Sequence, residues 1–234
     1  MCTVTFMPRS TTDFVLTSNR DESPSRETVP PKIYDHDGIR LLYPKDALAG
    51  GTWIGLSEHN RLICLLNGGF EPHEREEQYR MSRGVIVTDL LVSDHAQSAI
   101  ASYDFAGIEP FTIILVDWNK QLNIYELVWD GTDKHFNEKP LAPQIWSSSL
   151  LYTTEAKRKR EHWFSNFLFE SMSPSEENIL HFHRTAGEGN GEIDLIMDRG
   201  FVRTKSISQI TKNETHTSLR YEDLQLDGVA IETL

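Results

Sequence analysis

The first two-thirds of the chain contains short runs of apolar residues that alternate with polar residues or are bounded by turn residues. This period of two is typical of β-strands, and turn residues between neighbouring runs indicate antiparallel hairpins. A proline-rich, irregular stretch is expected at residues 23–31 and a short edge strand at residues 41–46. Three hairpins are predicted: residues 2–7 with 13–18, 52–56 with 61–66, and 111–116 with 122–129.

Helical periodicity appears in the middle of the chain. A helix is expected from Ser82 onward, and a second one with Ser93 as its N-cap. Residues 155–169 form a third helix whose aromatic stripe suits core packing, and Ser173, followed by Pro174, is expected to cap a fourth.

A further strand is expected at residues 145–151, before the third helix. After the fourth helix, strand patterns return towards the end of the chain. They are expected at residues 203–210, 216–221 and 228–233. Strands, then helices, then strands predict an α+β layered fold in which both chain ends join sheets. Nothing resembling a linker divides the chain, so we expect one domain over residues 1–234.

Composition narrows the class of protein. The chain has 234 residues and a net charge of −12, from 35 acidic and 23 basic side chains. This acidic balance argues against a nucleic-acid or anionic-membrane binder. No apolar run approaches the roughly 20 residues of a membrane helix. No signal segment is recognised at the start either, so a cytoplasmic protein is expected.

Two local motifs contain residues typical of ligand sites, but neither predicts one. His181 and His183 lie two positions apart in an expected helix, where their side chains diverge, and no third ligand is identifiable, so no metal site is predicted. The glycine-rich stretch at residues 187–191 is acidic and lacks a preceding parallel strand, which excludes a dinucleotide loop.

Cysteine is scarce, with two in the chain, and Cys2 follows the initiator methionine. If Met1 is removed, Cys2 carries a thiol and a free α-amine, whose ordinary pKa values are about 8.5 and about 7.7–8.0. The amine can then take the thiol proton, which makes a nucleophile and base within one residue. The alternative is that Cys2 is a small apolar strand residue. Cys64 lies in an apolar run and is expected to be buried.

Two polar corners accompany this cysteine at predicted hairpin ends. One is the run from Asn19 through Arg20 and Asp21 to Glu22, and the other is Asn67 with its two following glycines. If they converge, they supply a cation for a thiolate, a carboxylate to orient the amine, and donors for an oxyanion. The alternatives are a solvated loop and an ordinary glycine turn.

Five motifs stand out along the chain: Met1-Cys2, residues 18–22, residues 50–56, residues 66–69 and residues 200–204. Together they resemble the NRDE family, also called the transport and Golgi organisation 2 family. The resemblance spans nearly the whole chain. The family is similar in fold to the N-terminal-nucleophile (Ntn) hydrolases, so the resemblance implies a four-layer αββα sandwich with two antiparallel sheets.

The resemblance to cysteine amidases of this fold implies roles for individual residues. Cys2 matches the nucleophile, Arg20 and Asp21 the adjacent pair, Asn67 the oxyanion asparagine, and Arg203 a late arginine. Their second asparagine has no counterpart here. Trp53 lines the pocket or packs between the sheets. Asn19, Gly68 and Gly69 are expected to contact substrate.

The leading hypothesis is an Ntn cysteine hydrolase acting on a linear, non-peptide amide, with no cofactor required. The second is a non-catalytic carrier that uses the same cleft for haem or an acyl thioester. The third is a structural or interaction domain. Family membership also links such chains to secretory organisation, haem trafficking and lipid metabolism.

Overall fold

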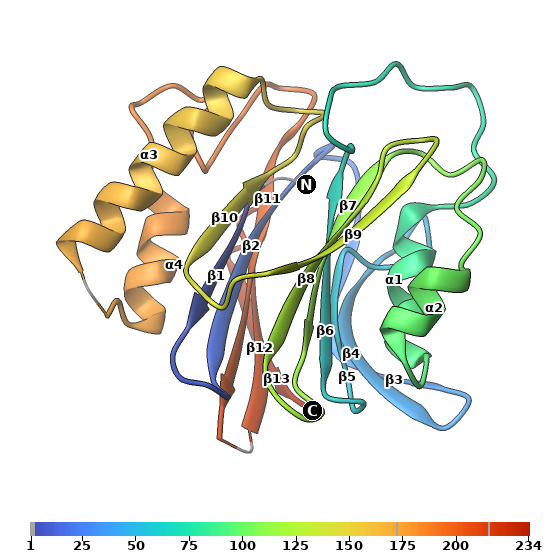
Figure 1. The fold of residues 1–234 in the computed structure, drawn as a ribbon. Coiled ribbons are helices and arrows are strands. Elements are labelled where there is room, and N and C mark those ends of the chain that lie inside the picture. Colours follow the sequence, from blue (N-terminus) through green and yellow to red (C-terminus); the bar gives the residue numbers. More distant parts are fainter. Residues whose placement is uncertain (1–2, 172, 215) are drawn as a thin grey trace.

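The computed structural model describes residues 3–171, 173–214 and 216–234, and its strands form two antiparallel sheets (Figure 1). The first sheet has the order β10-β1-β2-β11-β12-β13 and the second the order β3-β4-β5-β6-β7-β8-β9. The first sheet comprises β1 (Thr3–Pro8), β2 (Phe14–Glu22), β10 (Gln144–Ser147), β11 (Arg203–Asn213), β12 (His216–Asp223) and β13 (Gly228–Thr233). The second comprises β3 (Thr28–His36), β4 (Ile39–Asp46), β5 (Ile54–Ser57), β6 (Arg61–Asn67), β7 (Phe111–Asp117), β8 (Asn123–Trp129) and β9 (Lys134–Lys139).

Helices cover the outer face of each sheet, giving four layers (Figure 1). On the first sheet lie α3 (Thr154–Glu170) and α4 (Glu176–Thr185). On the second lie α1 (Arg83–Val92) and α2 (Ala96–Ser102). The predicted αββα sandwich is therefore confirmed.

The apolar positions of each central strand are divided between two cores. On β6, Leu62 and Leu66 face the core between the sheets, whereas Ile63 and Leu65 pack beneath α1 and α2. A strand that is covered on both faces has a nearly continuous apolar sequence, because both sets of its side chains are buried. This explains the unbroken hydrophobicity of residues 62–66.

All three predicted hairpins are present, but several strands differ from the expected ones. β2 continues through Glu22, and β4 lies inside its sheet between β3 and β5, so the expected edge strand is wrong. The expected irregular stretch at residues 23–31 is partly wrong, because β3 begins at Thr28. This strand tolerates two prolines because it is the sheet edge and its register shifts between Val29 and Lys32.

Two expected helix caps lie elsewhere. Ser93 is the C-cap of α1, and α2 has His95 at its N-cap position. The N-cap of α4 is Ser175 rather than Ser173, because Ser175 forms a reciprocal capping box with Asn178.

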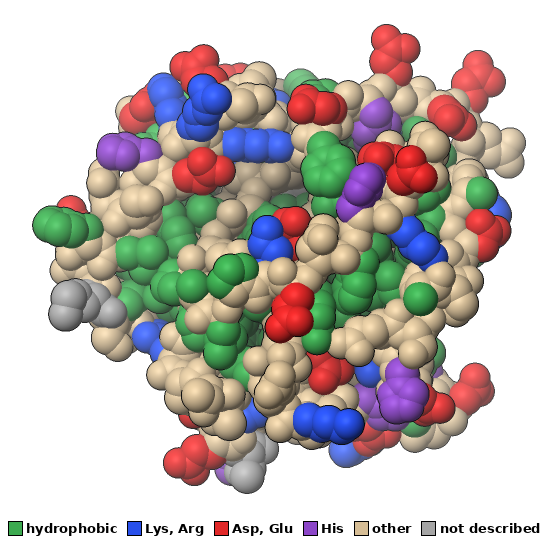
Figure 2. Space-filling view, in the orientation of Figure 1, with side chains coloured by type: hydrophobic (Ala, Val, Ile, Leu, Met, Phe, Trp, Pro, Cys, Tyr) green, Lys and Arg blue, Asp and Glu red, His purple; other side chains and the backbone are tan. Residues whose placement is uncertain are grey.

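The surface matches the acidic composition. Figure 2 shows acidic side chains scattered over the visible face, with basic side chains interspersed among them. None of the helices in the described residues has both the length and the apolar character needed to cross a bilayer.

Candidate functional site

The end of β2 is buried, so the interpretation of this corner as a solvated loop is wrong. Asn19, Arg20 and Asp21 are exposed by only 1%, 2% and 2%. Because successive strand residues point to opposite faces, Arg20 projects between the two sheets and its neighbours project towards the α3/α4 layer. The local sequence therefore places a cation and a carboxylate on opposite sides of one strand.

Arg20 is held by contacts from the second sheet. Its Nη2 donates to Oδ2 of Asp46 at 2.8 Å and its Nη1 to Oγ1 of Thr28 at 3.0 Å. The guanidinium carbon lies 4.2 Å from the centre of the Trp53 ring. Burial lowers the pKa of Arg20, while Glu22 and Asp46 oppose the shift. An arginine remains charged under these conditions.

Asp46 joins this arginine to the loop that follows β4. It also accepts from Nε of Arg26 at 2.9 Å and from the backbone N–H groups of Leu48 and Ala49. Burial alone would raise the pKa of Asp46, but the hydrogen bonds from Ala49 and Arg26 and the charge of Arg20 outweigh it and lower this pKa. The carboxylate is thus ionised and multiply bonded.

Asp21 is fixed on the opposite side of β2. The Tyr152 hydroxyl donates to its Oδ2 and the Thr204 hydroxyl to its Oδ1, each at 2.6 Å. The guanidinium carbon of Arg160 lies 3.4 Å from the centre of the Tyr152 ring. Burial and then the Asp21 charge raise the pKa of Tyr152, so the phenol stays protonated and donates. This carboxylate has a defined orientation.

Asn19 points into a structural network. Its Nδ2 donates to the carbonyls of His183 and Leu195, and its Oδ1 lies 2.6 Å from Nδ1 of His183. Burial, with a contribution from the Arg160 charge, lowers the pKa of His183 to about 3, so the imidazole is neutral. Asn19 does not line the cavity described next. Its geometry is that of a residue that anchors α4 rather than one that contacts substrate.

A cavity with about 440 Å³ of empty space opens between Arg20 and the start of α1. Trp53 lines this cavity and also packs in the core between the sheets. Asn67 lines it as well, and its buried Oδ1 has no hydrogen-bond partner among the described residues. The described lining residues are Arg20, Glu22, Arg26, Asp46, Ala49, Gly51, Thr52, Trp53, Leu65, Asn67, Ser82, Arg83 and Gly84.

The turn after Asn67 requires glycine. Gly68 has a φ of +90°, and a Cβ there would lie 2.8 Å from the backbone nitrogen of Leu150. Its N–H donates to the carbonyl of Pro110, so it is not available to an oxyanion. The Asn67 carbonyl accepts from the Ser148 hydroxyl, and that of Gly69 from the Ser149 hydroxyl. The turn is therefore a fixed structural element.

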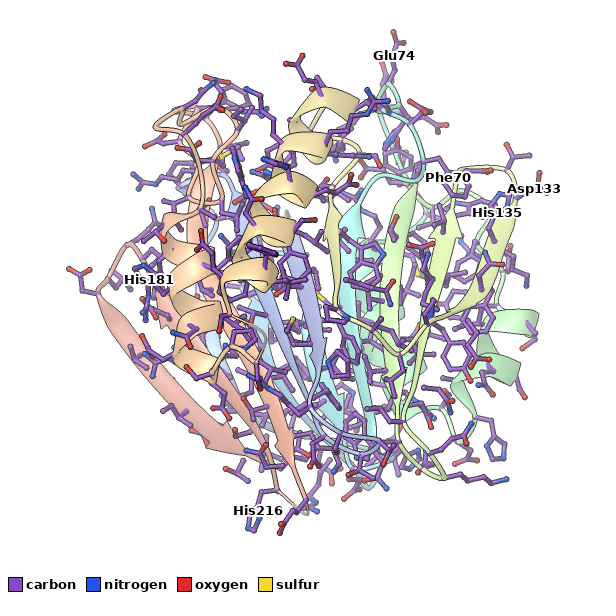
Figure 3. The ribbon with its side chains drawn as sticks, turned by 60° about the vertical axis from the view of Figure 1, so that its left-hand side comes forward. Phe70, Glu74, Asp133, His135, His181 and His216 are labelled. Atoms are coloured by element: carbon purple, nitrogen blue, oxygen red, sulfur yellow. The ribbon has the colours of Figure 1, made fainter. Side chains whose placement is uncertain are left out.

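Gly69 lines a second cavity, with about 660 Å³ of empty space, on the other side of this turn. Apolar side chains, among them Phe70 and Trp146, form much of its wall, and Lys157 of α3 contributes a charge. The ring of Phe70 also packs edge-on against the ring of His135, with 4.9 Å between the ring centres, at the end of the second sheet (Figure 3).

One predicted site residue lies outside the part of the chain that the structure describes, and another lines neither cavity. Cys2 lies outside the described residues; Thr3, which follows it, pairs with Asn19 and Ser147. Arg203 begins β11 and pairs with Glu22 in the backbone register, but it lines neither cavity. Cys64 is buried as expected, and burial raises the pKa of its thiol to about 12.

The histidine pair is split between two environments. His183 is buried against β2, whereas His181 is exposed on the outer side of α4 (Figure 3). Among the described residues, no three His, Cys, Asp or Glu side chains are grouped so that they would hold a metal ion.

The partners of the β2 residues are distant in sequence and were not predicted. Asp46, Tyr152 and Thr204 lie 26, 131 and 183 positions from the residues they contact. Local patterning carries no signal for such pairings. The run from Gly50 to Leu56, which did stand out, lies just after Asp46 and places Gly51, Thr52 and Trp53 in the cavity wall.

Known structures share this architecture at very low sequence identity. An orthologue of N-acylethanolamine-hydrolyzing acid amidase from Caenorhabditis elegans has a TM-score of 0.61 and 11% identity, covering 89% of this chain and 92% of its own. The C2A mutant of conjugated bile acid hydrolase from Clostridium perfringens has a TM-score of 0.58 and 9% identity, covering 100% and 96%. Penicillin V acylase from Agrobacterium tumefaciens has a TM-score of 0.56 and 8% identity, covering 100% and 86%.

These likenesses show that the fold is that of Ntn hydrolases. No curated protein matches the sequence. A family model described as transport and Golgi organisation 2 matches residues 1–184, which include β1, β2, the glycine turn and both cavities. The chain belongs to the transport and Golgi organisation 2 family.

Proposed function

We propose that this protein is an Ntn-type cysteine amidohydrolase that cleaves a small, linear, non-peptide amide. The observation that supports it best is the arrangement at the end of β2. There, Asp21 is oriented by two 2.6 Å hydrogen bonds on one side, while Arg20 and Asn67 share a cavity on the other. Cys2, one residue before Thr3, is the nucleophile in this proposal.

The proposed reaction begins after removal of Met1. The free α-amine of Cys2 takes the thiol proton, and the thiolate attacks the amide carbonyl carbon. Nδ2 of Asn67 donates to the resulting oxyanion, and Arg20 stabilises negative charge in the cavity. The protonated amine gives its proton to the leaving nitrogen as the C–N bond breaks. Water then hydrolyses the thioester and releases a carboxylic acid.

Asp21 has a supporting role in this scheme. A carboxylate held by Tyr152 and Thr204 accepts from an ammonium in a fixed direction. This interaction keeps the Cys2 amine oriented while its proton moves to and from the reacting atoms. Arg203, which lies in register with Glu22, remains a predicted contributor at the edge of this site.

The first test is the intact mass of untagged protein made in cells with normal methionine processing. Loss of one methionine is expected, and full retention would remove the proposed base. Native alkylation with iodoacetamide should then modify one cysteine, because Cys64 is buried with a raised pKa. The Cys2→Ala variant should lose both this alkylation and amide turnover.

The carrier is a second candidate, and the larger, partly apolar cavity beside Gly69 favours it. An acyl thioester suits this wall better than haem, because the described lining residues of both cavities include no His, Met, Tyr or Cys to ligate iron. A carrier would keep most of its binding in the Cys2→Ala variant. A hydrolase would lose turnover in the same variant.

A further inference from the structure

We propose that the cavity between Arg20 and the start of α1 binds a carboxylate, so that the preferred amide carries a carboxylate on a short acyl group. The substrate assignment rests on the proposed hydrolase function, whereas the binding site itself is tested separately below.

The charge around this cavity differs from that of the whole protein. The whole chain has a net charge of −12, yet three arginines and only two carboxylates line the cavity. Of the carboxylates, Asp46 is already bonded by two arginines and two backbone N–H groups. The lining charges are Arg20, Arg26, Arg83, Glu22 and Asp46.

The charged side chains next to the cavity lining do not cancel its excess of positive charge. Arg83 forms an ion pair with Glu109 at 3.0 Å, but Arg75 lies equally close to the same carboxylate. Lys205 is buried and donates to the backbone carbonyls of Pro24 and Arg26. A cationic excess in an acidic protein attracts an anion to this place in particular.

Two buried donors at the cavity have no acceptor among the described residues. They are Nε1 of Trp53 and Nε of Arg20, and both side chains are 2% exposed. A buried N–H without an acceptor costs about 1–3 kcal/mol. Arg20 and Trp53 both line the cavity, so a carboxylate bound there would bring two acceptor oxygens close to these donors.

The N-terminus of α1 also lies at this cavity. Ser82, its N-cap, and Gly84 both line the wall. The close approach depends on glycine, because a Cβ on Gly51 would lie 2.5 Å from the backbone carbon of Gly84. The positive end of the helix dipole favours an anion here, in addition to the buried donors.

The size of the cavity sets the length of the acyl group. Its 440 Å³ of empty space includes its open mouth, and polar groups make up most of the lining. A long alkyl chain would bury these polar groups without partners, which is unfavourable. A short dicarboxylic acid joined to an amine through one carboxyl group fits this chemistry.

The test uses glutarate as the probe and glutaramide, its uncharged diamide, as the matched control. Binding is followed by calorimetry and by tryptophan fluorescence, with Trp53→Phe identifying the signal of Trp53. We expect glutarate to bind about tenfold or more tightly than glutaramide. Arg83→Gln and Arg26→Gln should each weaken glutarate binding by about tenfold. Arg40→Gln, at an exposed ion pair with Glu58, should leave it unchanged.

The outcomes separate this inference from the proposed function. Equal binding of glutarate and glutaramide, or tighter binding of inorganic phosphate than of glutarate, would overturn the carboxylate site. Glutarate binding that persists in the Cys2→Ala variant supports the site, whether or not any amide is cleaved. Cleavage of butyramide as fast as of glutaramate would overturn the substrate assignment while leaving the hydrolase intact.

Discussion

The phenol hydroxyl of Tyr152 donates a 2.6 Å hydrogen bond to Oδ2 of Asp21, across 131 positions of the chain. This contact connects the loop after β10 to the end of β2, where the candidate site lies. Arg160 on α3 stacks over the same tyrosine ring and donates to Oγ1 of Thr3. Substitutions here therefore report on both folding and the orientation of the Asp21 carboxylate.

Tyr152→Phe removes a side-chain hydrogen bond that orients Asp21. We expect a loss of about 1–3 kcal/mol in unfolding free energy, because a buried carboxylate loses a donor. In the proposed hydrolase, kcat should fall by about tenfold, with a smaller change in KM. Urea unfolding and steady-state kinetics measure both effects.

The matched control is Tyr103→Phe, which removes an exposed hydroxyl that bonds to Asp89. That substitution should leave kcat unchanged. If Tyr152→Phe also kept full activity, the hydrogen bond to Asp21 would have no part in catalysis.

His183→Gln tests the pH dependence of stability. The unfolded chain protonates this histidine below about pH 6.5, whereas burial lowers the folded pKa to about 3. The contribution of the neutral His183 to the free energy of unfolding is therefore fully present above about pH 6.5. It is lost as the pH falls towards 3. Between about pH 7.5 and about pH 5, His183 should account for about 2 kcal/mol of the loss. The His183→Gln variant should lack this component, as measured by urea unfolding at the two pH values.

His181→Gln provides the control on the same helix, because His181 is exposed. Its pH dependence should match that of the unmodified protein. An unchanged pH dependence in His183→Gln as well would show that the buried imidazole is not the titrating group.

Asp46→Asn removes the charge that is shared by Arg20 and Arg26. Because Asp46 and Arg20 are both largely buried, we expect a loss of about 3 kcal/mol in unfolding free energy near neutral pH. The folded pKa of Asp46 lies below its ordinary value. The stabilisation is therefore present above about pH 4 and is lost as the pH falls further. Glu58→Gln, in the exposed pair with Arg40, should have a much smaller effect in the same unfolding experiment.

Gly51→Ala tests the close approach of α1 to the cavity. The added methyl group would meet backbone atoms of Gly84, which cannot move aside as a flexible side chain does. We expect a loss of about 1–3 kcal/mol in thermal or urea unfolding, from overpacking. Glutarate binding should weaken as well, because the start of α1 would be displaced. Gly228→Ala, where a Cβ would meet nothing within 4 Å, should change neither measurement.

The sequence by itself determined the elements whose signals are local. The three hairpins and the long helix α3 follow from hydrophobic periodicity and turn residues, which act over a few positions. The motifs at residues 18–22, 50–56 and 66–69 pointed to the family and to the correct fold. The same local signals missed β3 and β9 entirely, because edge strands with mixed polar residues lack a clear apolar face.

Only the tertiary structure decided what each candidate side chain contacts. It placed Arg20 against Asp46 and Trp53, and Asp21 against Tyr152 and Thr204. It also turned Asn19 towards His183 and away from the cavity. These partners come from strands, loops and helices that are distant in sequence, and they meet because burying both faces of two sheets fixes the layers relative to one another. Local periodicity sets which face of a strand a residue occupies, whereas packing between layers determines what lies opposite that face.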